Sequence, residues 1–90
     1  MTDKEYAIKI YCILFNVHHD RGNANIQGIF DMISTLEPKE QQFLESYYRH
    51  RNTYKKIAEL FDTTPSKVSN TIMKAKLKLK HESRMKYMKN

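Results

Sequence analysis

The sequence predicts an all-α fold, a bundle of four to five helices that ends in a helix-turn-helix. Three observations support this prediction. The chain has only two glycines and two prolines in 90 residues, which favours helices joined by short loops. Apolar residues recur at intervals of three and four in several segments, the spacing of one helix face. Residues 53–84 contain two such segments around a short polar turn, and the second segment is rich in lysine.

The first segment, residues 4–17, predicts a helix that is apolar on more than one side. Such a helix is buried on most faces or shared with a partner. The run IKIYCILF is also rich in β-branched and aromatic residues, so a strand is a second interpretation. No other strand is evident to pair with it, which favours the helix. A polar turn is expected at residues 18–23.

Two further helices are expected before residue 50. Residues 25–34 form the first, and Gly28 inside it indicates a close contact between helices. Its apolar face comprises Ile26, Ile29, Phe30 and Ile33. Glu37 and Pro38 open the next helix, which carries Phe43, Leu44, Tyr47 and Tyr48. Because the tyrosines occupy periodic apolar positions, we interpret them, with Tyr54, as packing residues and not as platforms for stacked bases.

The helix-turn-helix is expected from the spacing of residues 53–79. The first helix, residues 53–61, places Tyr54, Ile57, Ala58, Leu60 and Phe61 on one side, with the small Ala58 where the two helices cross. Thr64 is a good N-cap, and Pro65 suits the first helical position because its missing N–H costs nothing there. The second helix then keeps one stripe apolar, Val68, Ile72, Ala75 and Leu79, and directs its lysines elsewhere.

Positive charge is concentrated at the carboxyl end. Residues 1–36 carry three basic and four acidic side chains, whereas residues 66–90 carry eight basic side chains and one acidic side chain, Glu82. A basic face on a helix-turn-helix is typical of phosphate binding. A lysine-rich solvated tail is a weaker interpretation, because the charge adjoins a motif that can use it. A basic helix lying on a membrane is weaker too, because the hairpin already needs the narrow apolar stripe.

The composition gives no indication of an enzyme, a cofactor or a metal. One cysteine, Cys12, cannot form an intrachain disulfide, and its apolar surroundings predict a buried, inert thiol. His18, His19 and Asp20, with His50, lack the ligand spacing of a structural zinc site. No phosphate loop or nucleophile elbow is present. Neither a membrane span nor a leader peptide is evident, so a cytoplasmic protein is expected.

Three stretches of the second half together resemble region 4 of bacterial sigma factors, the subunits that direct RNA polymerase to promoters. LEPKEQQFLESYY at 36–48 is similar to the opening of that region, and TYKKIAELFDTTPSKV at 53–68 resembles its helix-turn-helix. KAKLKLKHESR at 74–84 aligns with its end in primary sigma factors, with Glu82 in place of a proline. The resemblance divides the chain into residues 1–35, a helix pair without a family match, and residues 36–90, a region 4-like part with a basic tail, within one compact domain.

The resemblance implies a DNA-binding transcription regulator that contacts promoter DNA through the second hairpin helix, and binding of the β-flap of RNA polymerase on an apolar surface. The positions that it implies for contact with the DNA backbone are Lys39, Thr53, Tyr54 and Lys74, and the basic face adds Lys67 and Lys78. Positions 65, 66 and 70 correspond to the Arg, Glu and Gln that read bases in primary sigma factors. Here they are Pro65, Ser66 and Asn70. Asn70 can still bond an adenine edge, and Ser66 and Ser69 can make weaker base contacts.

The departures from the family leave two functions open. No segment resembles the part of a sigma factor that melts the −10 element, so the chain resembles a free-standing region 4. One interpretation is a transcription regulator bound to double-stranded DNA in a bacterial or phage-infected cell. The alternative is an interaction module that binds RNA polymerase or a sigma factor without reading DNA. The first helix either supports a homodimer or packs over the apolar groove of the hairpin.

Overall fold

In a computed structural model, which describes residues 2–17, 22 and 25–87 with side chains to Ser83, the chain forms helices and no strand within those ranges. The helices are α1 (Asp3–Phe15), α2 (Ile26–Ile33), α3 (Pro38–Tyr48), α4 (Tyr54–Leu60) and α5 (Pro65–Tyr87). They confirm the predicted helical fold class, and the helical interpretation of residues 4–17 over the strand. Most of the predicted turn at residues 18–23 lies outside the described residues.

Side-chain caps fix where most of the helices begin. Thr2 and Glu5 form a reciprocal capping box at the start of α1, and Asn25 accepts a hydrogen bond from the Gly28 amide at the start of α2. The hydroxyls of Thr53 and Thr64 accept from the amides of residues 56 and 67 and so cap α4 and α5. These bonds satisfy backbone N–H groups that have no partner inside a helix.

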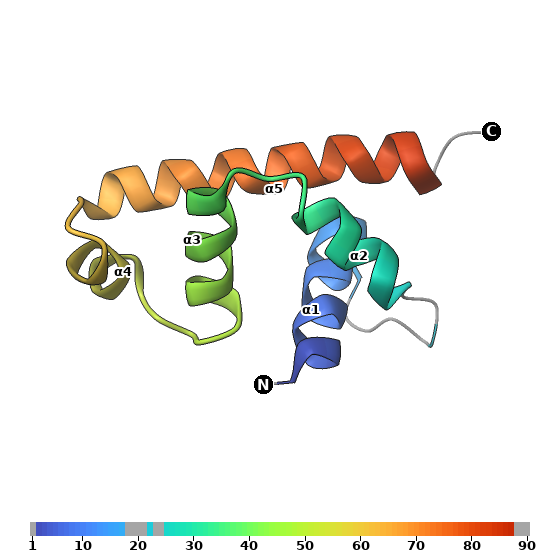
Figure 1. Cartoon of the computed structure of the whole chain (residues 1–90), viewed down its shortest axis with the longest axis horizontal. Coiled ribbons are helices and arrows are strands. Elements are labelled where there is room, and N and C mark those ends of the chain that lie inside the picture. Colours follow the sequence, from blue (N-terminus) through green and yellow to red (C-terminus); the bar gives the residue numbers. More distant parts are fainter. Residues whose placement is uncertain (1, 18–21, 23–24, 88–90) are drawn as a thin grey trace.

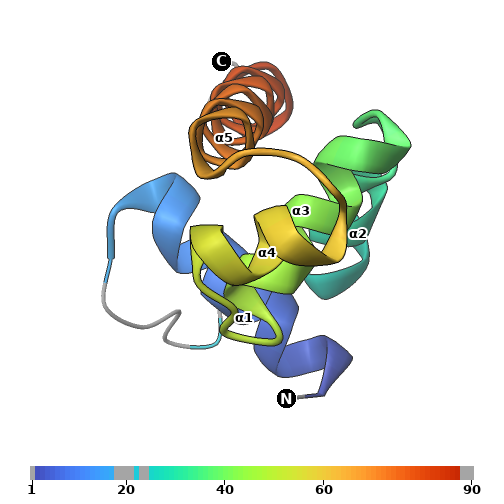
Figure 2. The same cartoon turned by 90° about the vertical axis from the view of Figure 1, so that its left-hand side faces the viewer.

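The long helix α5 is the element on which the others assemble (Figure 1). It has 23 residues, which at about 1.5 Å per residue gives a rod about 34 Å long. The molecule is correspondingly elongated, with extents of 42 × 24 × 19 Å. α3 and α4 pack against the amino-terminal half of α5, and α1 and α2 pack against its carboxyl-terminal half (Figure 1). The view along the long axis shows all four of the shorter helices below α5 (Figure 2).

One apolar core runs beneath α5 and takes side chains from all five helices. The predicted stripe of α5 is confirmed, because Val68, Ile72, Ala75 and Leu79 are each at most 1% exposed. Helices α1 and α2 contribute Tyr6, Ala7, Ile10, Leu14, Ile29, Met32 and Ile33. α1 also contacts α3, so it packs within its own chain, on the faces of α3 and α5. The homodimer stays a prediction.

Two predicted positions were wrong in detail. Leu60 is 57% exposed, although we expected it on the apolar side of the first hairpin helix. At about 100° per residue it points about 110° away from the centre of the face made by Ile57 and Ala58. Cys12 is half-buried and not buried, because it lies across α1 from the buried stripe that contains Ile10 and Leu14.

Candidate nucleic-acid interface

The helix-turn-helix expected from the sequence is formed by α4, residues 61–64 and α5. α4 and α5 pack against each other, and each buries an apolar side chain near the turn, since Ala58 is 4% exposed and Val68 is fully buried. The Thr63 amide donates to the Ala58 carbonyl at 2.9 Å and closes the end of α4. Asp62 adopts a left-handed conformation with φ 53°, which turns the chain toward α5. Aspartate tolerates this conformation better than most residues do.

The amino-terminal turns of α5 present polar side chains on the side away from the core. Pro65, Ser66 and Asn70 are all exposed. Ser69 is half-buried and interacts with the phenol of Tyr54 on α4. Of the four positions expected to face bases, three are therefore open to solvent, and the fourth is directed toward the neighbouring helix.

The positions expected to contact phosphate are spread over three helices. Lys67 and Lys74 are exposed on α5, Lys39 is exposed near the start of α3, and Thr53 caps α4. The ring of Tyr54 stacks on that of Tyr47, with centroids 4.7 Å apart. Burial raises the pKa of the Tyr54 phenol, and hydrogen bonding with Tyr47 raises it further, so the phenol is neutral and can donate a hydrogen bond at ordinary pH.

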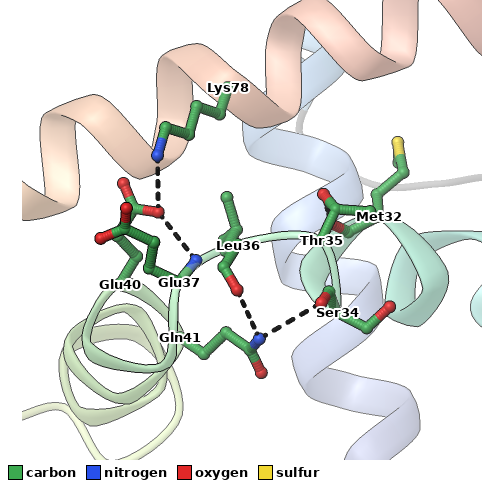
Figure 3. A network of polar contacts seen from close by, with 8 residues as sticks. All are labelled: Met32, Ser34, Thr35, Leu36, Glu37, Glu40, Gln41 and Lys78. Atoms are coloured by element: carbon green, nitrogen blue, oxygen red, sulfur yellow. Dashed lines mark hydrogen bonds and ion pairs between the residues drawn. The ribbon is translucent and has the colours of Figure 1, made fainter.

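Lys78, the sixth of these positions, forms an ion pair with a side chain of α3. Its Nζ lies 2.9 Å from Oε1 of Glu40 on α3, and the same carboxylate accepts from the Glu37 amide at 3.0 Å (Figure 3). The Glu40 side chain is 6% exposed, whereas that of Lys78 is 50% exposed. Lys78 therefore neutralises a buried carboxylate, and half of its side chain stays open to solvent.

The pKa values of this pair shift in the directions expected of an ion pair. Burial alone would raise the pKa of Glu40, but hydrogen bonds from Lys78 and the Glu37 amide outweigh it and lower that pKa below its ordinary value. The Glu40 carboxylate raises the pKa of Lys78. Both groups are charged near neutral pH, and the pair joins α3 to the middle of α5.

Sequence reasoning missed two cations on the first hairpin helix. Lys55 and Lys56 are exposed on α4, two and three residues after the cap at Thr53. Lys80, one of the lysines expected to point away from the apolar stripe of the second helix, is exposed on α5. The ammonium of Lys76 lies 6.0 Å from the ring centre of Tyr48. The adjacency of Lys55 and Lys56 to Tyr54 was a signal in the sequence that we did not use. The guanidinium of Arg49, in contrast, is held by Asp3 at 2.7 Å.

The described part of the chain contains no group of three or more residues that could hold a metal ion. His50 lies 3.6 Å from a carboxylate oxygen of Glu45, and the other members of the histidine set considered in the sequence, residues 18–20, lie outside the described residues. No described helix has the length and hydropathy needed to cross a membrane.

Comparison with known families gives one match. The model of the family "Sigma-70, region 4" matches residues 26–79, more than half of the chain. The match begins at Ile26, so it includes α2, which the sequence analysis placed in the front part without a family match. It ends at Leu79, before the HESR motif. Comparisons with curated proteins and with solved structures found no match.

The matched residues contain the whole helix-turn-helix and the exposed start of α5 described above. Domains of this family are non-enzymatic and serve transcription, binding DNA and the β-flap of RNA polymerase. The match spans α2, α3, α4 and α5 as far as Leu79, and it leaves out α1. This chain belongs to the sigma-70 region 4 family, and its role is a sigma-factor-like one in binding DNA or RNA polymerase.

Proposed function

We propose that this protein is a transcription regulator of the bacterial or phage-infected cytoplasm that binds duplex DNA through the amino-terminal half of α5. The observation that carries the proposal is the outer face of that half. Ser66 and Asn70 are exposed there between lysines, on a helix whose start is fixed by the Thr64 cap. A capped helix of this kind can enter a major groove with its first turns toward the bases.

The lysines would supply the affinity. Lys39, Lys67 and Lys74 are exposed and have no carboxylate partner among the described side chains, so each can neutralise a phosphate. Lys78 can do so with the half of its side chain that is open, and Thr53 and Tyr54 can donate hydrogen bonds to the backbone. Each phosphate neutralised by a lysine changes the slope of log K against log salt by roughly −0.9, so the four lysines give a slope of about −4. Hydrogen bonds from the neutral Thr53 and Tyr54 add nothing to that slope.

Titration of random-sequence duplex by fluorescence anisotropy at several salt concentrations tests the proposal. We expect binding at low salt with that slope. Lys74→Ala should weaken binding to all sequences alike and reduce the slope by about 1, whereas Asn70→Ala should change the preference between sequences. Lys4→Ala, which removes an exposed lysine from α1, is the matched control and should change neither quantity. No binding at low salt would rule out the proposal.

A second candidate function is a module that binds RNA polymerase or a sigma factor. It is favoured by two observations on base reading. The three base-reading side chains of primary sigma factors are replaced by Pro65, Ser66 and Asn70, and Ser69 is half-buried against Tyr54. Because α1 packs on α3 and α5, a partner that binds those apolar faces has to displace it.

The second candidate is tested by pull-down from a bacterial lysate, probed for RNA polymerase and sigma factors. Hydrogen exchange on the mixture with purified RNA polymerase then locates the contact. Displacement of α1 by the partner would increase exchange of the amides in residues 7–15, whereas a partner bound on another surface would leave them protected. A pull-down that retains neither RNA polymerase nor a sigma factor contradicts this function.

A further inference from the structure

Two large apolar side chains on α5 are exposed, although four other positions of that helix form its buried stripe. Met73 is 58% exposed and Leu77 is 61% exposed. Both continue the line of Ser66 and Asn70 along the helix, since residues 66, 70, 73 and 77 follow one another at intervals of four, three and four. At about 100° per residue, this outer strip lies opposite Val68 and Ile72.

Lysines lie on both sides of the outer strip. Lys67, Lys74 and Lys78 follow one edge, and Lys76 and Lys80 follow the other, on the same helical geometry. A helix seated in a major groove directs the middle of its exposed face at the base edges and its two flanks at the phosphate backbones. With lysines on both flanks, the outer strip would therefore face the base edges at the floor of the major groove.

The width of the groove separates Met73 from Leu77. Met73 lies about 12 Å along the axis from Pro65, and Leu77 lies about 18 Å along it, at about 1.5 Å per residue. The major groove is about 12 Å wide. Met73 is thus the last residue of the outer strip within the width of the groove when Pro65 lies at its near edge, whereas Leu77 lies about 6 Å beyond it.

The chemistry of Asn70 and Met73 selects one kind of base pair. An asparagine amide bonds N6 and N7 of adenine with both of its groups, and the apolar feature of the major groove is the 5-methyl group of thymine. The two residues are about 4.5 Å apart along α5, close to the spacing of about 3.4 Å between successive base pairs. The long, flexible thioether side chain of methionine adapts well to an apolar contact of this kind.

From this placement, we infer that Met73 is a specificity-determining residue that contacts the 5-methyl group of a thymine next to the adenine faced by Asn70. The preferred sites are then rich in A·T pairs at the steps beneath the second and third turns of α5. The inference rests on the proposed DNA binding and adds a residue and a base preference to it.

Replacement of thymine by uracil tests the inference, because it removes the 5-methyl group and leaves every hydrogen-bonding atom in place. The probes are a 20-base-pair alternating A·T duplex, the same duplex with deoxyuridine in place of thymidine, and a G·C duplex of equal length. Burial of one methyl group corresponds to about fourfold in affinity. We expect the wild type to bind the thymine duplex about fourfold more tightly than the uracil duplex, and the G·C duplex more weakly than either.

Two substitutions on the outer strip locate the effect. Met73→Ala should bind the thymine and uracil duplexes equally, whereas Leu77→Ala should keep the fourfold ratio. Both side chains are exposed, so both variants should fold, and their circular dichroism spectra check this. An equal affinity of the wild type for the two duplexes, a ratio retained in Met73→Ala, or a ratio lost in Leu77→Ala overturns the inference while DNA binding stands. Absence of binding to all three duplexes at low salt overturns the proposed function, and the inference with it.

Discussion

The two halves of α5 bury one continuous apolar stripe against different pairs of helices. α3 and α4 pack against the amino-terminal half of α5, and α4 forms the helix-turn-helix with it. The outer side of this half of α5 carries Asn70 and exposed lysines. At the carboxyl-terminal half, α1 and α2 cover the helix and add most of the remaining core (Figure 1). Residues 1–36 have one more acidic than basic side chain, so the front pair adds burial without positive charge. The contrast shows that α1 and α2 add buried apolar surface without positive charge, whereas the half with α3 and α4 combines a buried core with exposed lysines.

Removing a core side chain from each half is the strongest way to test whether they fold as one unit. Phe43 is 1% exposed and lies 5.0 Å from the ring of Phe61, centre to centre. We expect Phe43→Ala to lower the free energy of unfolding by about 3–5 kcal/mol, and Ile29→Ala in the front half by about 2–5 kcal/mol.

Urea unfolding of both variants, followed by far-UV circular dichroism and by tyrosine fluorescence, measures these losses. One cooperative core should give a single transition that coincides for the two probes in each variant. Separate transitions for the two halves would contradict the shared core.

The ion pair between Glu40 and Lys78 fastens the middle of α5 to α3, and its loss should come next in size. We expect Glu40→Gln to cost about 1–2 kcal/mol at pH 7, because the buried carboxylate accepts hydrogen bonds from Lys78 and the Glu37 amide. Glutamine can still accept from the amide but has no charge for Lys78.

The pH dependence identifies that carboxylate. The pKa of Glu40 is lowered from an ordinary value of 4.5, so its stabilising effect is present above that pH and is lost as the pH falls through the lowered value. Thermal melts from neutral to acid pH should show the wild type and Glu40→Gln converging at the acid end. Parallel curves would mean that another group dominates the acid response.

The cap at Thr64 affects the amino-terminal half of α5 alone. Its hydroxyl accepts from the Lys67 amide at 3.3 Å, so we expect Thr64→Ala to cost about 1 kcal/mol, or about 4–8 °C in Tm. DNA binding should weaken as well, because the first turn of α5 would fray. Ser66→Ala, at an exposed position two residues further on, is the control for stability and should melt like the wild type.

The contact between Asp3 and Arg49 joins α1 to the end of α3 and should have the smallest effect. Its atoms are 2.7 Å apart, but the Asp3 side chain is 73% exposed. We expect Asp3→Asn to cost less than about 1 kcal/mol, because exposed ion pairs are screened by water and salt. The difference in Tm from the wild type should vanish at about 1 M salt. A loss that persists in salt would indicate packing and not charge.

The sequence predicts those features of the fold that depend on local rules. Helix spacing, the Thr64 cap and the stripe through Val68 and Leu79 are each predicted from residues close together in the chain, and all of them are confirmed. Exposure at a helix end is harder to predict: Leu60 is apolar and near in sequence to Ile57, yet α4 ends there and leaves it in solvent.

Contacts between distant residues could not be predicted in the same way. Nothing local in the chain indicates that Glu40 meets Lys78 38 positions later, or that Ser69 lies against Tyr54. Both contacts arise from how α3 and α4 pack on α5. They bear directly on the candidate site, because they leave Lys78 and Ser69 less available than Lys74 and Asn70.

Helix α5 has no glycine or proline after Pro65, so between Ser66 and Tyr87 it offers no joint at which the rod would bend. A partner that binds or loosens α1 and α2 can tilt the carboxyl-terminal end of α5. Because the helix is stiff, the same rotation then reaches Asn70 near its amino-terminal end. A small angular change becomes a displacement of the side chains at the far end. In the proposed complex with DNA, α1 and α2 would thereby influence the angle at which the first turns of α5 meet the major groove.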